Sequence, residues 1–136
     1  MKAVLFDLGG TLVWYYGRSE IPQVLQQAIT EVQNFLRDKR LLKTSSESIW
    51  RAMEEENHEA KDNSVRPLEE RLARVFQLHS TRSEELLMTM CRHFMKPIFS
   101  RGRCYEDSLP VLRALRSKGL KTAIVSNTSW GSPAVL

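Results

Sequence analysis

The sequence predicts an α/β fold in which two strands of a parallel sheet are separated by an all-helical insertion. Three observations predict it. Residues 3–6 and 121–125 are short apolar runs, each ending at turn or hydroxyl residues. Residues 21–99 repeat apolar positions with the helical period. A further helical pattern leads directly into the second run, as in half of a βαβ unit.

The first strand is expected over residues 3–6, A-V-L-F. Neither this run nor the one at residues 121–125 alternates apolar and polar residues, so we expect both strands to be buried on both faces. Asp7 ends it, and Gly9 and Gly10 follow, which allow a sharp turn and a close approach of backbone amides to an anion.

Four helices are expected in the insertion. Pro22 opens the first, the second begins at about Ser46, Pro67 starts the third and Ser83 caps the fourth. Their apolar stripes are interpreted as core rather than as cofactor sites. The residues expected to point inward are Leu25, Ile29, Val32, Leu36, Trp50, Met53, Leu68, Leu72, Val75, Phe76, Leu86, Leu87, Met90, Phe94 and Met95.

The second strand carries the other half of the candidate site. Ser108 caps and Pro110 opens a helix that stops at Gly119, and the strand over residues 121–125 follows. It ends at Ser126 and Asn127. Because ligands bind beyond the carboxyl ends of parallel strands, we expect Asp7 and Ser126 to face one crevice, with Thr11 close by.

Two interpretations of this pair of strand ends stay open on the residues alone. Asp7 is suited to act as a nucleophile, a base or a metal ligand, with hydroxyls of Thr11 and Ser126 holding phosphoryl oxygens. Alternatively, Asp7 caps a turn and Ser126 bonds backbone.

Composition excludes several other classes. The 136-residue chain has a formal net charge of +4, but its basic residues are spread without a block or interleaved aromatics, so no nucleic-acid binding is expected. Cys91 and Cys104 lack zinc-site or redox-pair spacing. No secretory signal and no apolar stretch of membrane-spanning length is present, which favours reduced thiols and a cytoplasmic location.

The motifs F-D-L-G-G-T-L at residues 6–12 and L-R-x-L-R-x-K-G-L-K-T-A-I-V-S-N at 112–127 resemble the haloacid dehalogenase (HAD) superfamily. An insertion directly after the first motif resembles the helical cap of that family. The resemblance implies a partial HAD-like Rossmannoid parallel sheet. It places an incomplete core at residues 1–13 and 105–136 and a helical cap at 14–104.

The same resemblance implies a mechanism. Asp7 would be the nucleophile that forms a covalent aspartyl intermediate, and Ser126 would bind the transferred phosphoryl group. Gly10, Thr11 and Asn127 would contact a small phosphorylated, or otherwise activated, substrate. Mg²⁺ would be held by Asp7 and by the backbone carbonyl of Gly9.

Two departures from the family pattern limit this expectation. Gly9 stands where family phosphatases usually carry a second aspartate, so it cannot protonate a leaving group, a loss typically of about 10²–10⁴-fold in rate. The later lysine and acidic motifs have no counterpart after Ser126. We therefore expect a truncated chain that is inactive alone, with an incomplete Mg²⁺ site and self-association through an exposed sheet edge.

Two rival interpretations remain. D-L-G-G-T is also the phosphate loop of sugar kinases with the actin-like fold, in which residues 12–17 would form the returning strand of a hairpin. The other is a non-catalytic remnant or interaction protein. A helix soon after Trp14 would count against the kinase.

Overall fold

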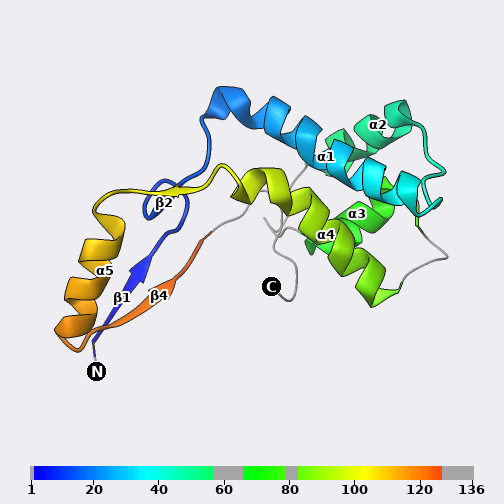
Figure 1. Cartoon of the computed structure of the whole chain (residues 1–136). Helices are drawn as coiled ribbons and strands as arrows, with labels where there is room; N and C mark the ends of the chain where they lie inside the picture. The colour runs from blue at the N-terminus through cyan, green and yellow to red at the C-terminus, as the bar shows by residue number, and fades with distance from the viewer. Residues whose placement is uncertain (1, 57–65, 79–82, 127–136) are drawn as a thin grey trace. The chain divides into compact units, whose positions relative to one another are not determined.

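The computed structural model describes residues 2–56, 66–78 and 83–126, and it has the predicted mixed α/β organisation (Figure 1). The chain divides into two compact units. One comprises the described residues of 1–24 and 98–127, and the other those of 25–97. Among the described residues, no helix is both long and apolar enough to cross a membrane.

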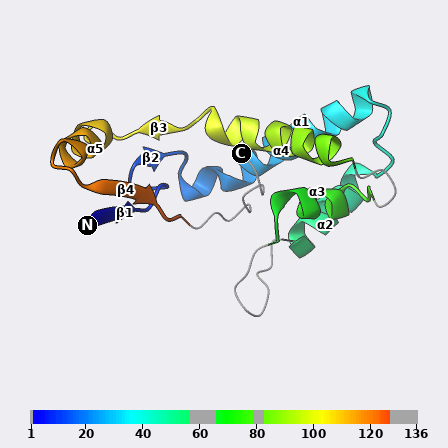
Figure 2. The ribbon, with the colours of Figure 1, turned by 90° about the horizontal axis from the view of Figure 1, so that it is seen from below.

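The first unit is built on a parallel strand pair. β1 (Ala3–Phe6) lies beside β4 (Lys121–Ile124), with Ala3 opposite Lys121 and Phe6 opposite Ile124. Helix α5 (Ser108–Ser117) precedes β4 and lies to one side of the two strands in both views (Figures 1 and 2). The turn between α5 and β4 passes through Gly119, whose φ of 71° favours glycine. This helix-to-strand connection confirms the predicted half of a βαβ unit.

A short antiparallel ribbon also belongs to this unit. β2 (Val13–Trp14) pairs with β3 (Arg103–Cys104). The chain then enters a 3-10 turn, η1 (Arg18–Glu20), and helix α1. The kinase interpretation required a returning strand through residues 12–17. Residues 13–14 are extended, but they pair with β3, and helical structure begins soon after Trp14.

The second unit contains most of four helices. They are α1 (Ile21–Asp38), α2 (Ser46–Glu56), α3 (Leu68–Val75) and α4 (Glu84–Phe99). Three of the predicted starts fit closely, because α2 begins at Ser46, Pro67 is the N-cap of α3, and the Ser83 hydroxyl accepts the Leu86 N–H at 3.2 Å.

The predicted helical stripes form the core of this unit. Of the expected inward residues, Ile29, Val32, Leu36, Met53, Leu68, Leu72, Val75, Phe76, Met90 and Phe94 are buried, whereas Leu25, Trp50, Leu86, Leu87 and Met95 are half-buried. Buried polar groups are bonded across helices. The Arg71 guanidinium donates to the Glu56 carbonyl at 3.1 Å, and the Gln33 amide donates to the Ser46 hydroxyl at 3.2 Å.

The expectation that both strands are buried on both faces is wrong for the described residues. Leu5 is 64% exposed and Ile124 is 57% exposed, while Val4 and Phe6 are half-buried. The physical reason is the amount of cover. In the described part of the chain this sheet has two strands, and one helix, α5, leads into β4 and lies beside them, so apolar side chains remain at the surface.

Candidate functional site

The parallel pairing places two predicted site residues at the same edge of the sheet. Asp7 directly follows β1, and Ser126 comes two residues after the end of β4. The ladder continues one step past the strands, because the Val125 N–H donates to the Phe6 carbonyl at 2.8 Å. Both residues therefore leave the sheet at its carboxyl edge, where ligands bind in open α/β sheets.

The loop after Asp7 is a tight turn organised around one carbonyl. The Leu8 carbonyl accepts the N–H groups of Thr11, Leu12 and Val13 at 3.4, 3.0 and 2.9 Å. The Gly10 N–H donates to the Val13 carbonyl at 2.9 Å, and Gly10 has a φ of 79°, a conformation that favours glycine. The G-G-T stretch thus makes the sharp turn that the two glycines predict.

The candidate side chains differ in exposure. Asp7 is exposed, and its Oδ1 accepts the Leu8 N–H at 2.8 Å. Thr11 is exposed and Ser126 is half-buried. Asn127 lies outside the described residues. The bond to Leu8 leaves Asp7 with a second carboxylate oxygen and further acceptor capacity toward solvent.

A neighbouring cluster holds the loop and the ribbon in place. A Cβ added to Gly102 would lie 3.1 Å from the Tyr15 ring and 3.2 Å from the Phe99 carbonyl, so the chain packs closely there. Burial raises the pKa of the Tyr15 hydroxyl, and the neighbouring Tyr16 adds to the effect. Sequence reasoning missed this cluster, because a glycine and a tyrosine 87 residues apart in the chain give no signal of mutual contact.

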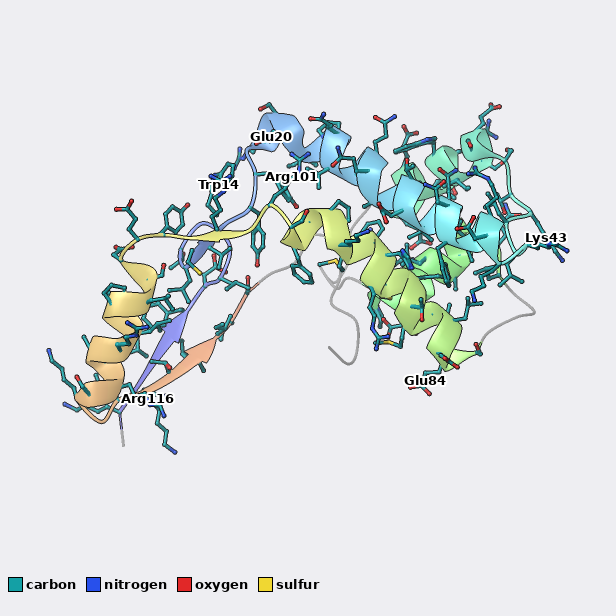
Figure 3. All side chains as sticks on the ribbon, in the orientation of Figure 1. Trp14, Glu20, Lys43, Glu84, Arg101 and Arg116 are labelled. Carbon is teal, nitrogen blue, oxygen red and sulfur yellow. The ribbon has the colours of Figure 1, made fainter. Side chains whose placement is uncertain are left out.

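An ion pair at the start of the helical insertion was also missed. The Arg101 guanidinium lies 3.2 Å from the Glu20 carboxylate, which also accepts the Gly17 N–H at 2.8 Å (Figure 3). The positive charge of Arg101 is thus directed to Glu20.

Ser108 differs from its predicted role. It is the first residue of α5, whose N-cap is Asp107, and it does not itself cap the helix. Its side chain is 3% exposed and donates to the Leu12 carbonyl at 2.8 Å. This bond ties α5 to the loop that carries the candidate site, a contact across 96 residues of chain that no local pattern could indicate.

The described residues do not complete a site for a divalent cation. In this part of the chain, no group of three or more His, Cys, Asp or Glu side chains is placed to hold a metal ion. Asp7 and the Gly9 carbonyl are two oxygen donors, fewer than Mg²⁺ requires for a specific site.

An α/β unit with an aspartate after its first strand, a glycine turn and a hydroxyl residue after a neighbouring strand defines a candidate phosphoryl-transfer or hydrolase domain. The family model for haloacid dehalogenase-like hydrolases matches residues 1–136. The chain belongs to this family, whose members generally use Mg²⁺. Membership decides against the kinase interpretation.

Among solved structures, the chain is similar to a predicted phosphoglycolate phosphatase from Haemophilus somnus 129PT. The identity is 23% and the TM-score is 0.35, and the match covers 93% of this chain and 51% of that one. The chain therefore spans about half the length of this solved relative. No curated protein matches the sequence.

Proposed function

We propose that Asp7 is the nucleophile of a HAD-type hydrolase that acts on a small phosphorylated, or otherwise activated, molecule. One observation carries the proposal. The in-register parallel pairing of β1 and β4 brings Asp7 and Ser126 to the same edge of the sheet. Family membership supports the chemistry, and the exposure of Asp7 leaves its free oxygen accessible to a substrate.

In the proposed reaction, an oxygen of Asp7 attacks phosphorus, and the bond from phosphorus to the leaving group breaks with its electron pair on the leaving group. The Ser126 hydroxyl donates to a phosphoryl oxygen. Groups of Gly10, Thr11 and Asn127 hold the rest of the phosphoryl group. Because Gly9 has no side chain to donate a proton, the reaction favours leaving groups that depart as stable anions.

The proposed Mg²⁺ contacts are the Asp7 carboxylate and the Gly9 carbonyl. Neither the described residues nor the sequence after Ser126 supplies the further acidic groups or the lysine of the family pattern. Without preorganised positive charge, transfer of the phosphoryl group from Asp7 to water is poorly catalysed, so we propose that the 136-residue chain forms the covalent intermediate but does not turn over alone.

The proposed partners are a small-molecule substrate and a second copy of the chain. Two features support self-association. Apolar side chains on both strands are exposed. In the described part of the chain the sheet also has only two strands, so its edges are left unpaired. A cytoplasmic location is proposed because Cys91 and Cys104 are both free thiols, as is usual for proteins of a reducing compartment.

The nucleophile is tested with acetyl phosphate, whose acetate leaving group needs no proton. The purified chain is incubated with it and analysed by intact-mass spectrometry beside an Asp7→Asn variant. The expected result is one phosphoryl adduct, removable with hydroxylamine, on the wild type and none on the variant. A Thr11→Val variant serves as a control, since it keeps the nucleophile and is expected to slow adduct formation without abolishing it.

Two results would overturn parts of the proposal. An adduct that persists in Asp7→Asn, or no adduct on the wild type, would exclude Asp7 as the nucleophile. Release of inorganic phosphate over many cycles, lost in Asp7→Asn, would show that the chain is active alone.

A further inference from the structure

One face of the β1–β4 pair is apolar, exposed and bounded by opposite charges. Paired residues of parallel strands point to the same face, and successive residues alternate. Leu5 is opposite Ala123, and the hydrogen bond from Val125 to Phe6 extends the ladder by one further pair. We call this surface the open face; its residues are Ala3, Leu5, Asp7, Lys121, Ala123 and Val125.

The two faces of the pair are covered unequally. The difference lies in β1: on the opposite face Val4 and Phe6 are half-buried, although Ile124, which pairs with Phe6, is 57% exposed there. A cavity of about 310 Å³ is lined by Leu12 and Leu112 from the loop and α5, by Phe6, and by Thr122, Ala123 and Ile124 of β4. On the open face Leu5 is 64% exposed and Val125 is 61% exposed. Exposed apolar residues that adjoin one another in this way mark interaction sites.

The charges at the two ends of the open face are complementary. Lys121 lies at the amino end and Asp7 at the carboxyl end. Both are exposed, and neither has an ion pair to another described residue. A partner that carries the same arrangement in the reverse direction would match both ends at once.

We propose that the open face binds the open face of a second copy of this chain. The two copies are related by a two-fold axis that lies between the faces and runs perpendicular to the strands. This rotation reverses the strand direction, so Lys121 of each copy meets Asp7 of the other, and Leu5 and Val125 pack between them. A two-fold interface of this kind closes and forms a dimer rather than a fibre.

Simple dimensions agree with this arrangement. Lys121 pairs with Ala3, so along the strand direction it lies four residues before Asp7, a separation of roughly 13 Å at the usual rise of a strand. Stacked sheets lie about 10 Å apart. A lysine and an aspartate that approach from facing sheets span this gap. Two strands present only a small area, well under about 1,200 Å² in total, so the dimer is weak and its population depends on concentration.

The assignment rests on the self-association proposed above and is independent of the hydrolase chemistry. Mass in solution is measured by light scattering and sedimentation over a wide range of concentration. The wild type is expected to shift reversibly from one chain to two. Leu5→Lys is expected to weaken association about tenfold or more. Leu109→Lys, on α5 and 51% exposed, is the matched control and is expected to leave association unchanged.

Charge reversal tests the orientation of the two copies. Lys121→Glu and Asp7→Lys each place like charges together across the interface and are expected to weaken association. The double variant restores the opposite charges and is expected to recover it, with far-UV circular dichroism verifying that each variant is folded.

The outcomes separate the two levels of the proposal. A wild-type chain that stays monomeric at every concentration would refute self-association altogether. Association that withstands Leu5→Lys, that is lost equally in Leu109→Lys, or that the double reversal fails to recover would refute the open-face assignment alone. The acetyl phosphate adduct, measured separately on dilute protein, reports on the hydrolase proposal.

Discussion

The bond between Ser108 and Leu12 makes a quantitative prediction about what holds the site loop against α5. The Ser108 hydroxyl donates to the Leu12 carbonyl at 2.8 Å, and the side chain is 3% exposed. Ser108→Ala removes the donor but leaves that carbonyl with the Tyr105 N–H at 3.2 Å, so no acceptor is left without a partner. We therefore expect the ordinary loss for one buried hydrogen bond, about 1 kcal/mol in the free energy of unfolding.

The chain offers a matched control in the same helix. The Ser117 hydroxyl donates to the Ala114 carbonyl at 2.9 Å, but this bond is exposed to solvent and joins residues three apart. Ser117→Ala removes the same atom without disturbing a contact between elements. We expect its effect on the free energy of unfolding to stay within about 0.5 kcal/mol.

The assay must report on the strand-bearing unit. Trp14 lies on β2, so a background in which Trp50 and Trp130 are replaced by phenylalanine gives a fluorescence signal for this unit. With a urea slope of about 1–3 kcal/mol per molar, Ser108→Ala is expected to lower the midpoint by about 0.5 M. Equal midpoints for Ser108→Ala and Ser117→Ala would refute the argument that this bond anchors the loop.

Three further predictions follow from local geometry. Gly102→Ala is expected to destabilise the strand-bearing unit by about 1–3 kcal/mol in urea unfolding, because its Cβ would lie 3.1 Å from Tyr15. Gly17→Ala is the milder control, because its Cβ would lie 3.5 Å from its nearest neighbour. Burial raises the pKa of the Cys91 thiol from 9.0 to about 12. The unfolded chain therefore releases this proton at lower pH than the folded chain, and the free energy of unfolding falls as the pH rises between these two values. Cys91→Ala is expected to flatten that part of the curve of unfolding free energy against pH. Gly9→Asp, whose Cβ would meet the Tyr15 ring at an ordinary 3.9 Å, is expected to speed adduct formation with an aryl phosphate at least about tenfold and to leave acetyl phosphate unaffected.

The helices were predictable because each start has its own local signal. Ser46, Pro67 and Ser83 mark starts through backbone preference and capping, which need no distant partner. The strand over residues 121–124 was predictable for a similar reason, since a helix and a glycine turn lead into it. Burial of the strands was not predictable from their composition, because cover depends on which other elements reach them.

The sheet edge at which the candidate site residues lie was predictable from the sequence, whereas the contacts that hold the surrounding loops were not. Asp7 and Ser126 end apolar runs, and parallel pairing alone brings such ends to one edge. The contacts that hold the surrounding loops join residues far apart in the chain, such as Ser108 with Leu12 next to the site loop and Arg101 with Glu20 at the start of the helical insertion. A hydroxyl or a guanidinium has many suitable partners in a sequence, and only the fold selects one of them.

The proposed dimer and the proposed reaction both require the Asp7 carboxylate. In the proposed dimer, Asp7 of one copy faces Lys121 of the other, and in the proposed reaction Asp7 must reach phosphorus. An ammonium beside a carboxylate favours its charged form, yet it also occupies the oxygen that would attack. Dimerisation should therefore protect Asp7 from acetyl phosphate, and adduct yield should fall as the chain concentration rises through the association range. The Leu5→Lys variant separates the two effects, since it weakens the dimer and leaves the Asp7 loop unchanged. If its adduct yield shows the same fall with concentration as the wild type, the dimer does not cover Asp7.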